Sequence, residues 1–423
     1  MELGDYGALF FFTVGVSAFL ATYLPFSPMT IDIVNLRRET QLEIFRHRVA
    51  LWTIGSVSLT AVLSLGLTAM ADPGWGWAVV AAAGLLLFMF WSGYVPWVMT
   101  APADQRVVTA QEAGQLLSPD ESVLGLYHRG EARAYPRALI ARPHFLTDTV
   151  AGTPMTISYC ILCNSGIAFI SELNGRALDL DCVTAYNNNI IYRDKRTGNI
   201  IQQLDGRVIE GPDCGESLES LPLTVMTWAE WRSLHPETRV CYAPARTFRD
   251  KMVGTMLEFL IPVSKLSKRA APWHRVRGDL DTRLPAMSYV FGVEIGDERC
   301  AFPESFLRDH PVHNDVVGGQ AIVTLFDPAG AYGGVFGRAL DGMVLHFDAI
   351  KDADGIDRIV DRETESTWNI AGEAVDGEKR GRTLSPVPHF NKVFWFGWSL
   401  FKPGTKIVQE ETGVGAGPER LAT

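Results

Sequence analysis

The sequence has little cysteine, no excess of basic charge and no nucleotide-binding motif. Its 423 residues include only six cysteines, too few for a disulfide framework in a chain of this length. The formal net charge of -10 argues against nucleic acid as a partner, because phosphate binding needs a concentrated basic face. No GxGxxG or Walker pattern lies between an expected strand and helix, so we expect no nucleotide cofactor.

The N-terminal part is far more apolar than the rest of the chain. Three segments, Tyr6 to Phe26, Val49 to Met70 and Trp77 to Met99, contain no charged residue and are each long enough to cross a hydrocarbon core. The sequence therefore predicts a membrane anchor with three transmembrane helices in residues 1–101. The expected partners are the lipid bilayer and another membrane protein.

Loop charge predicts an orientation for this anchor. The segment between the first two predicted spans holds four arginines, whereas residues 100–127 hold only one. Because cytoplasmic loops carry the excess of basic residues, we expect a bacterial-type inner (plasma) membrane protein with its soluble region in the cytoplasm. One missed span would reverse the orientation, so a periplasmic soluble region remains the alternative.

The soluble region alternates short β-prone runs with Gly, Asp, Asn and Pro turns. Several landmarks recur at a constant offset of 167 residues, as between Val123 and Val290. The matched landmarks are Val123-Leu124-Gly125-Leu126 with Val290-Phe291-Gly292-Val293, Asp148 with Asp315, Asp194 with Asp361, and Trp228 and Trp231 with Trp395 and Trp398. We predict a mainly β (α+β) region made of two tandem homologous repeats, 102–245 and 286–423, joined by a connection at 246–285.

A pair of thiols is the most informative motif in the first repeat. Cys160 and Cys163 follow an apolar, β-prone run and precede the turn formers Asn164, Ser165 and Gly166. Two thiols with this spacing can bind a soft metal ion together or close a small disulfide ring. The second repeat has Asp327 and Gly330 at the equivalent positions, so we expect only the first repeat to keep a site.

His144 is the candidate third ligand. If the turn at Gly152 places the two flanking segments on adjacent strands, His144 meets the thiols in a Cys₂His set suited to copper or zinc. Asp148 is then a candidate to orient the imidazole from behind. The structural alternatives are an ordinary turn histidine and a turn-forming aspartate.

Two other functions remain open, and the sequence does not decide whether the chain is an enzyme. One is a thiol-disulfide oxidoreductase, although a reactive CxxC usually opens a helix and this one precedes a turn into another strand. The other is a non-enzymatic, membrane-tethered docking subunit in which the thiols only pack. Metal binding, metal delivery and metal-supported redox chemistry are the uses that we expect of a Cys₂His site.

An ordered set of motifs resembles a known family. The motifs are Ala132-Arg133-Ala134-Tyr135-Pro136, His144, Asp148-Thr149-Val150-Ala151-Gly152, Tyr159-Cys160-Ile161-Leu162-Cys163-Asn164-Ser165, Thr227-Trp228-Ala229-Glu230-Trp231 and Phe394-Trp395-Phe396-Gly397-Trp398. Together they resemble the domain of unknown function 3179 family over roughly Pro119 to Val408. The chain departs from the family at Ile161, where the family usually has proline, and at 198–201, where a Glu-Ser-x-Trp segment is replaced. The resemblance implies no particular reaction.

Overall fold

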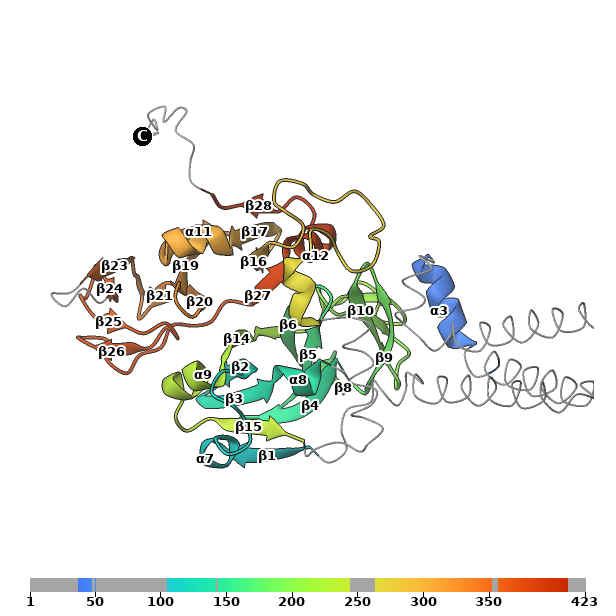
Figure 1. The fold of residues 1–423 in the computed structure, drawn as a ribbon, viewed down its shortest axis with the longest axis horizontal. Coiled ribbons are helices and arrows are strands. Elements are labelled where there is room, and N and C mark those ends of the chain that lie inside the picture. The colour runs from blue at the N-terminus through green and yellow to red at the C-terminus, as the bar shows by residue number, and fades with distance from the viewer. Residues whose placement is uncertain are drawn as a thin grey trace, which may run out of the picture.

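The computed structural model describes residues 37–47, 50, 105–141, 144–243, 263–351 and 357–409, and this part of the chain is mainly β (Figure 1). None of the helices in these ranges is long and apolar enough to cross a membrane. The longest α-helix among them, α3 (Arg38–Arg46), has 9 residues and spans about 13 Å, less than half of a hydrocarbon core. The predicted three transmembrane helices are thus not found among the described residues. Apart from Ala50, the three proposed spans lie outside the described residues.

The first half of the β region runs from Arg106 to Tyr242. Strands alternate with short helices, and most strands are joined by tight turns. In chain order its elements are β1 (Arg106–Thr109), α7 (Ala110–Ala113), β2 (Ser122–His128), β3 (Glu131–Pro136), α8 (Arg137–Ile140), β4 (Phe145–Val150), β5 (Thr153–Cys160), β6 (Ser165–Ile170), β7 (Glu172–Leu173), β8 (Arg176–Ala177), β9 (Leu180–Tyr186), β10 (Asn189–Asp194), β11 (Ile200–Gln202), β12 (Val208–Glu210), β13 (Ser220–Pro222), β14 (Thr224–Thr227), α9 (Trp228–Leu234) and β15 (Arg239–Tyr242).

The second half runs from Tyr289 to Ile407 and follows a connection that contains the 3₁₀ helix η2 (Val263–Lys268). Its elements are β16 (Tyr289–Ile295), β17 (Glu298–Pro303), α11 (Glu304–Asp309), β18 (Val312–Val317), β19 (Gln320–Asp327), β20 (Tyr332–Gly337), β21 (Ala339–Leu340), β22 (Met343–Val344), β23 (Phe347–Lys351), β24 (Asp357–Asp361), β25 (Thr367–Trp368), β26 (Ala374–Asp376), β27 (His389–Phe394), α12 (Trp395–Phe401) and β28 (Lys406–Ile407).

The two halves have the same topology. Elements from β2 onward recur in the second half at the offset of 167 residues, as Ser122 and Tyr289 show where β2 and β16 begin. Sheet order β15-β3-β2-β14 in the first half corresponds to β28-β17-β16-β27 in the second. Even the parallel pairs agree in register, because Arg239 lies opposite Arg133 and Lys406 opposite Cys300. The chain therefore folds twice into the same arrangement of a mixed sheet and two antiparallel meanders.

The halves pack reciprocally on one another. Strand β27 of the second half contacts β6 of the first, and β20 of the second half contacts β14 of the first (Figure 1). Because β6 corresponds to β20 and β14 to β27, each half makes the same contact with its partner. The largest hydrophobic core spans this boundary and joins Phe169 and Leu204 to Phe390, Phe394 and Trp398.

One close packing feature occurs in both halves. Gly125 in β2 lies under the indole of Trp231, and an added Cβ would come within 2.2 Å of that ring. Gly292 in β16 lies in the same way under Trp398, at 2.4 Å. Helices α9 and α12 can sit against their sheets only because these strand positions carry no side chain.

This packing predicts a stability effect. We expect Gly125→Ala to lower the free energy of unfolding by about 1–3 kcal/mol, because the added methyl group must displace a buried indole. The matched control is Gly114→Ala, whose added Cβ meets the flexible Arg232 Nη1 at 3.1 Å. Urea unfolding of the full chain measures both, and equal stability of the two variants would contradict the packing argument.

Candidate functional site

The two thiols lie at the tight turn between β5 and β6. Cys160 is the last residue of β5 and lies opposite Ser165, the first residue of β6. The chain reverses through residues 161–164, where Asn164 has φ 52°, a left-handed conformation that asparagine tolerates better than most residues. A hairpin this short holds both sulfur atoms at one end of the sheet.

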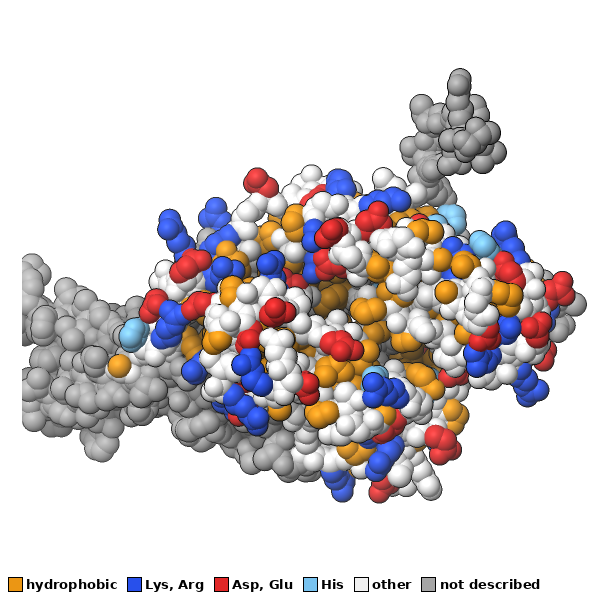
Figure 2. Space-filling model, turned by 180° about the vertical axis from the view of Figure 1, so that it is seen from behind, with side chains coloured by type: hydrophobic (Ala, Val, Ile, Leu, Met, Phe, Trp, Pro, Cys, Tyr) orange, Lys and Arg blue, Asp and Glu red, His pale blue; other side chains and the backbone are white. Residues whose placement is uncertain are grey.

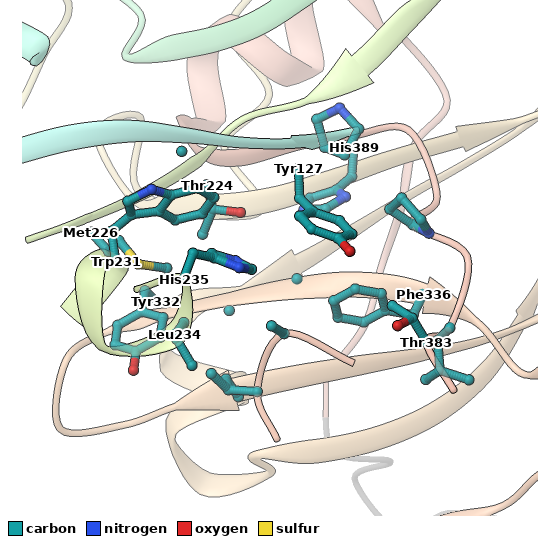
Figure 3. A pocket seen from close by; sticks show the side chains of 18 residues that line it. Tyr127, Thr224, Met226, Trp231, Leu234, His235, Tyr332, Phe336, Thr383 and His389 are labelled. Atoms are coloured by element: carbon teal, nitrogen blue, oxygen red, sulfur yellow. The ribbon is translucent and has the colours of Figure 1, made fainter. Parts of the chain in front are cut away.

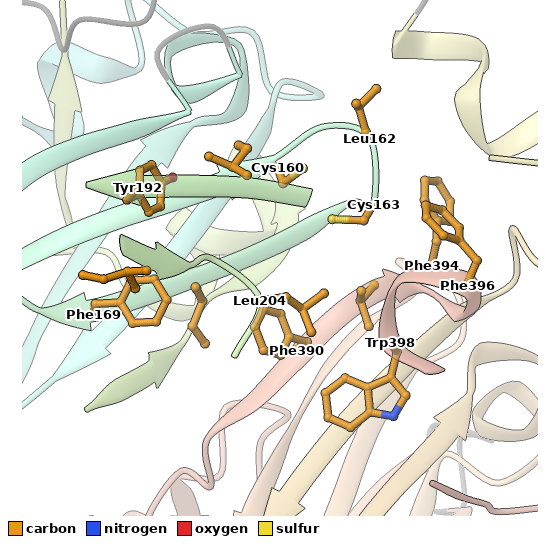
Figure 4. Close-up of a cluster of buried hydrophobic side chains, with 14 of the residues drawn as sticks. Cys160, Leu162, Cys163, Phe169, Tyr192, Leu204, Phe390, Phe394, Phe396 and Trp398 are labelled. Carbon is orange, nitrogen blue, oxygen red and sulfur yellow. The ribbon is translucent and has the colours of Figure 1, made fainter. Parts of the chain in front are cut away.

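This thiol turn is buried against the second half of the chain (Figure 4). The exposed fraction is 1% for Cys160 and 0% for Cys163. The backbone N–H of Phe394 donates to the carbonyl oxygen of Cys163 at 2.9 Å, and Asn164 Nδ2 donates to Lys392 O at 2.5 Å. An added Cβ at Gly397 would come within 2.9 Å of the Cys163 Cβ, so helix α12 approaches the turn as closely as a glycine permits.

A buried polar network surrounds the sulfur of Cys163. Asn189 Nδ2 donates a hydrogen bond to Cys163 Sγ at 3.2 Å, and the Ser165 hydroxyl lies 3.0 Å from the same sulfur. Gln203 Oε1 holds both neighbours, since it accepts from Asn189 Nδ2 at 2.7 Å and from Ser165 Oγ at 2.8 Å. The amide of Asn189 has two hydrogens and can serve the sulfur and Gln203 together.

Ser165 can serve either acceptor, because its hydroxyl has one hydrogen. When Cys163 is a thiol, the hydroxyl can donate to Gln203 Oε1 and accept from the S–H group. When Cys163 is a thiolate, the hydroxyl can turn its hydrogen to the sulfur, while Asn189 still satisfies Gln203. The network therefore accommodates both protonation states without leaving the Gln203 carbonyl unpaired.

The two thiols are made chemically different by this environment. Burial raises the pKa of the Cys163 thiol, but hydrogen bonds from Cys160, Ser165 and Asn189 outweigh it and hold this pKa below the ordinary value. Burial raises the pKa of Cys160 well above the ordinary value, and its single hydrogen can go either to Cys163 or to Asn188 O, which lies 3.2 Å from Cys160 Sγ. The arrangement favours a Cys163 thiolate beside a protonated Cys160.

The connection between the halves covers the thiol turn. Asn187 and Asn188 form the tip of the β9–β10 hairpin, both with positive φ. Asn188 Oδ1 accepts from His274 N at 2.8 Å and its Nδ2 donates to His274 O at 3.0 Å. Asn187 makes the same two bonds with the backbone of Arg277, at 2.9 and 3.3 Å. Side-chain amides thus replace a strand partner and hold residues 274–277 beside the thiols.

His144 does not join the thiols. Its Nδ1 lies 3.2 Å from Tyr159 O, and burial lowers the pKa of its imidazole to about 4. The physical reason is strand alternation: Phe145 pairs with Ser158, so Phe145 is the β4 residue on the face of Cys160. A shift of one residue puts His144 outside that face.

Asp148 also has other partners. Its Oδ2 accepts from the Tyr135 hydroxyl at 2.9 Å and pairs with Arg133 Nε at 3.2 Å. Within the described ranges no group of three or more His, Cys, Asp or Glu side chains could hold a metal ion. The predicted metal-binding character of the site is therefore corrected, because Cys160 and Cys163 lack a third ligand among these residues.

Sequence reasoning missed the amides that surround Cys163. Asn189 begins β10, Gln202 ends β11 and Gln203 follows it directly, so all three are remote in sequence from the thiols. Each is at most 2% exposed. The sequence signal for these residues is the pair Gln202-Gln203 directly after Ile200-Ile201. Two adjacent amides at the end of an apolar strand indicate a buried polar network, because buried amides need hydrogen-bond partners.

Removing an amide tests the electrostatic difference between the thiols. We expect Asn189→Leu to raise the pKa of Cys163, because the sulfur loses a hydrogen bond that favours its charged form. Thiolate absorbance near ~240 nm, followed against pH in chains with and without Cys163→Ser, measures this pKa. The control Asn174→Leu removes an exposed amide that binds Asp213 and leaves the Cys163 titration unchanged. An unchanged pKa in Asn189→Leu would contradict the assigned role.

A second prediction concerns acid stability. Burial lowers the pKa of His274, which is 5% exposed, from 6.5 to about 4. Between these values the unfolded chain binds a proton that the folded chain does not, so stability falls as the pH falls. We expect His274→Gln to reduce this slope by up to about 1.4 kcal/mol per pH unit. Urea unfolding at several pH values measures it, and His47→Gln at an exposed histidine should leave the slope unchanged.

Comparison with known proteins identifies a family without assigning a reaction. The model of the family described as "Protein of unknown function (DUF3179)" matches residues 96–405, which confirms the resemblance noted in the sequence. No curated protein and no solved structure matches the chain. On the strength of a match that covers most of its length, the chain belongs to the DUF3179 family.

Proposed function

We propose that Cys160 and Cys163 form a dithiol–disulfide redox centre. The observation that carries the proposal is the polar network at one of the two sulfurs: Asn189 Nδ2 and the Ser165 hydroxyl lie 3.2 and 3.0 Å from Cys163 Sγ and favour its thiolate, whereas burial raises the pKa of Cys160. A thiolate is the attacking form in thiol–disulfide exchange, and a neighbouring thiol resolves the mixed disulfide. Cys163 is thus the attacking residue and Cys160 the resolving residue.

The proposed oxidant is a small-molecule disulfide, and the exchange is balanced in two steps. Cys163 S⁻ attacks one sulfur of the disulfide R–S–S–R, forms the mixed disulfide Cys163–S–S–R and releases RS⁻. Cys160 then loses its proton, attacks the Cys163 sulfur and releases the second RS⁻. Starting from the Cys163 thiolate and the Cys160 thiol, the pair loses two electrons and one proton, and the disulfide gains two electrons as two thiolates.

The surrounding residues support this assignment because they occur only in the first half. The positions equivalent to Cys160, Cys163, Ser165 and Gln203 are Asp327, Gly330, Tyr332 and Ile370. Thus the second half has the same hairpin but neither the thiols nor the polar partners that would favour a thiolate. A network confined to the thiol-bearing half is the pattern expected of a functional site rather than of the shared fold.

Access requires movement of the cover, because both thiols are buried. The side-chain amide of Asn188 bonds to the backbone of His274, and that of Asn187 to the backbone of Arg277. These hydrogen bonds are the contacts that must open. Asn187→Gly preserves the left-handed backbone and removes the two bonds to Arg277. We expect this variant to react faster with the disulfide than the wild type does.

The test follows oxidation of the reduced full chain by glutathione disulfide, read by mass spectrometry. All variants carry Cys214→Ser, because Cys214 is exposed and reacts independently. We expect the wild-type pair to lose two hydrogen atoms and form a Cys160–Cys163 bond. Cys160→Ser should stop at a glutathione adduct on Cys163, and Cys163→Ser should leave Cys160 unreacted.

A different outcome would rule the proposal out. If both thiols of the folded wild type stay free after prolonged incubation, yet react once the chain is unfolded, the pair is structural. Faster oxidation of Asn187→Gly than of an exposed-surface control, Asn174→Gly, would separate opening of the cover from a general loss of stability. Both asparagines have positive φ, so the two substitutions are matched in backbone conformation.

A further inference from the structure

A cleft lies between the two halves, away from the thiols. It is lined from the first half by β2, β14 and α9, and from the second half by β20 and the segment before β27. Hydrophobic side chains border a hollow in the middle of the face shown in Figure 2. Figure 3 shows the aromatic side chains of Tyr127, Trp231, Tyr332 and Phe336 around this cleft. A concave site with an apolar and aromatic lining is typical of small-molecule binding.

The reciprocal position in the fold has a different lining. There, Ile167 and Leu204 occupy the places that Gly334 and Ala371 take in the cleft, at the same offset of 167 residues. The charged residues Asp205, Glu294 and Lys402 also line that position. The cleft thus has two small residues where the reciprocal position has two large apolar ones, and only the reciprocal position is lined by charged side chains.

His389 gives the cleft an unmet hydrogen-bond acceptor. Its Nδ1 lies 2.7 Å from Val387 O, which fixes the hydrogen on Nδ1, and burial lowers the pKa of the imidazole to about 4. The ring is therefore neutral and Nε2 carries a lone pair. His389 is 4% exposed, and its Nε2 has no hydrogen-bond partner among the residues that the structure describes. A buried acceptor without a donor costs free energy that a bound donor would recover.

His389 borders both the cleft and the reciprocal position, and it lies in the part of β27 that meets β20. His389 and Asn391 are two residues apart in β27, and Asn391 Nδ2 donates to Gly333 O at 2.7 Å. Gly333 itself lines the cleft. Side chains two residues apart share a face of a strand, so His389 lies on the face of β27 that meets β20.

We propose that this cleft binds a neutral, planar aromatic molecule that carries a hydroxyl group, with the hydroxyl donating to His389 Nε2. The described lining residues include no Asp, Glu, Lys or Arg, so the cleft offers no charge to pair with an ionic ligand. Aromatic rings stack on the faces that Tyr127, His235 and Phe336 supply. The Tyr127 and His235 rings already stack on each other at 5.2 Å and form one wall.

The test uses 2-naphthol and 2-methoxynaphthalene, which share a ring system and differ in the hydrogen-bond donor. Isothermal titration calorimetry of the full chain measures binding of each probe. We expect saturable binding of 2-naphthol, with 2-methoxynaphthalene bound about tenfold more weakly because Nε2 then stays unpaired. Ala371→Leu should abolish binding of both probes by restoring the side chain found at Leu204.

Two further variants separate the cleft from general effects. Val375→Leu enlarges an exposed apolar residue in the neighbouring strand β26 and should leave binding unchanged. His389→Phe should bring the two probes to equal affinity, and His389→Gln, which restores an acceptor, should recover part of the preference for 2-naphthol. Absence of 2-naphthol binding to the wild type, equal affinity for the two probes, or unchanged binding in a folded Ala371→Leu variant would overturn the proposal.

Discussion

The structure depends on the reciprocal packing of its two homologous halves. Each half offers one strand to the other, β6 against β27 and β20 against β14, and the main hydrophobic core lies across that boundary. Phe394, Phe396 and Trp398 from the second half are at most 2% exposed there, and each fully buried side chain of this size contributes about 1.5–3 kcal/mol. Separating the halves would expose apolar surface of this shared core, which opposes independent folding of the two repeats.

The thiol turn contacts residues of the second half as well as residues of its own half. The backbone of Phe394 and the glycine at 397 lie directly against Cys163, while Asn189 and Gln203 approach it from strands of its own half. A change in the bonding of the two sulfurs would therefore act on contacts that join the halves. Buried networks of this kind are strongly coupled, because an unpaired polar group in such a place costs more free energy than a hydrogen bond contributes.

The halves have kept one topology and diverged in their side chains. The first half has the thiols and their amide partners, whereas the second has Asp327 and Gly330 at the equivalent turn. The second half instead contributes Gly334 and Ala371, which leave space for the cleft. Paired glycine and tryptophan residues, Gly125 with Trp231 and Gly292 with Trp398, are retained in both halves because helix packing needs them.

The strands and the repeat could be predicted from the amino-acid sequence alone. Alternating β-prone runs and turn residues indicate strands, and the 167-residue spacing of matched landmarks is the spacing of the observed elements, because both depend on residues near one another in the chain. The family could also be identified from ordered motifs. The apolar N-terminal runs suggested membrane spans that no described helix provides.

The contacts between side chains that are remote in sequence could be identified only from the tertiary structure. Strand alternation put Phe145 rather than His144 on the thiol face, a distinction of one residue that spacing could not supply. Asn189 reaches Cys163 across a separation of 26 residues, and Gln203 reaches Ser165 across a separation of 38 residues. The thiol chemistry and the cleft both arise from contacts between remote segments, which local sequence patterns do not encode.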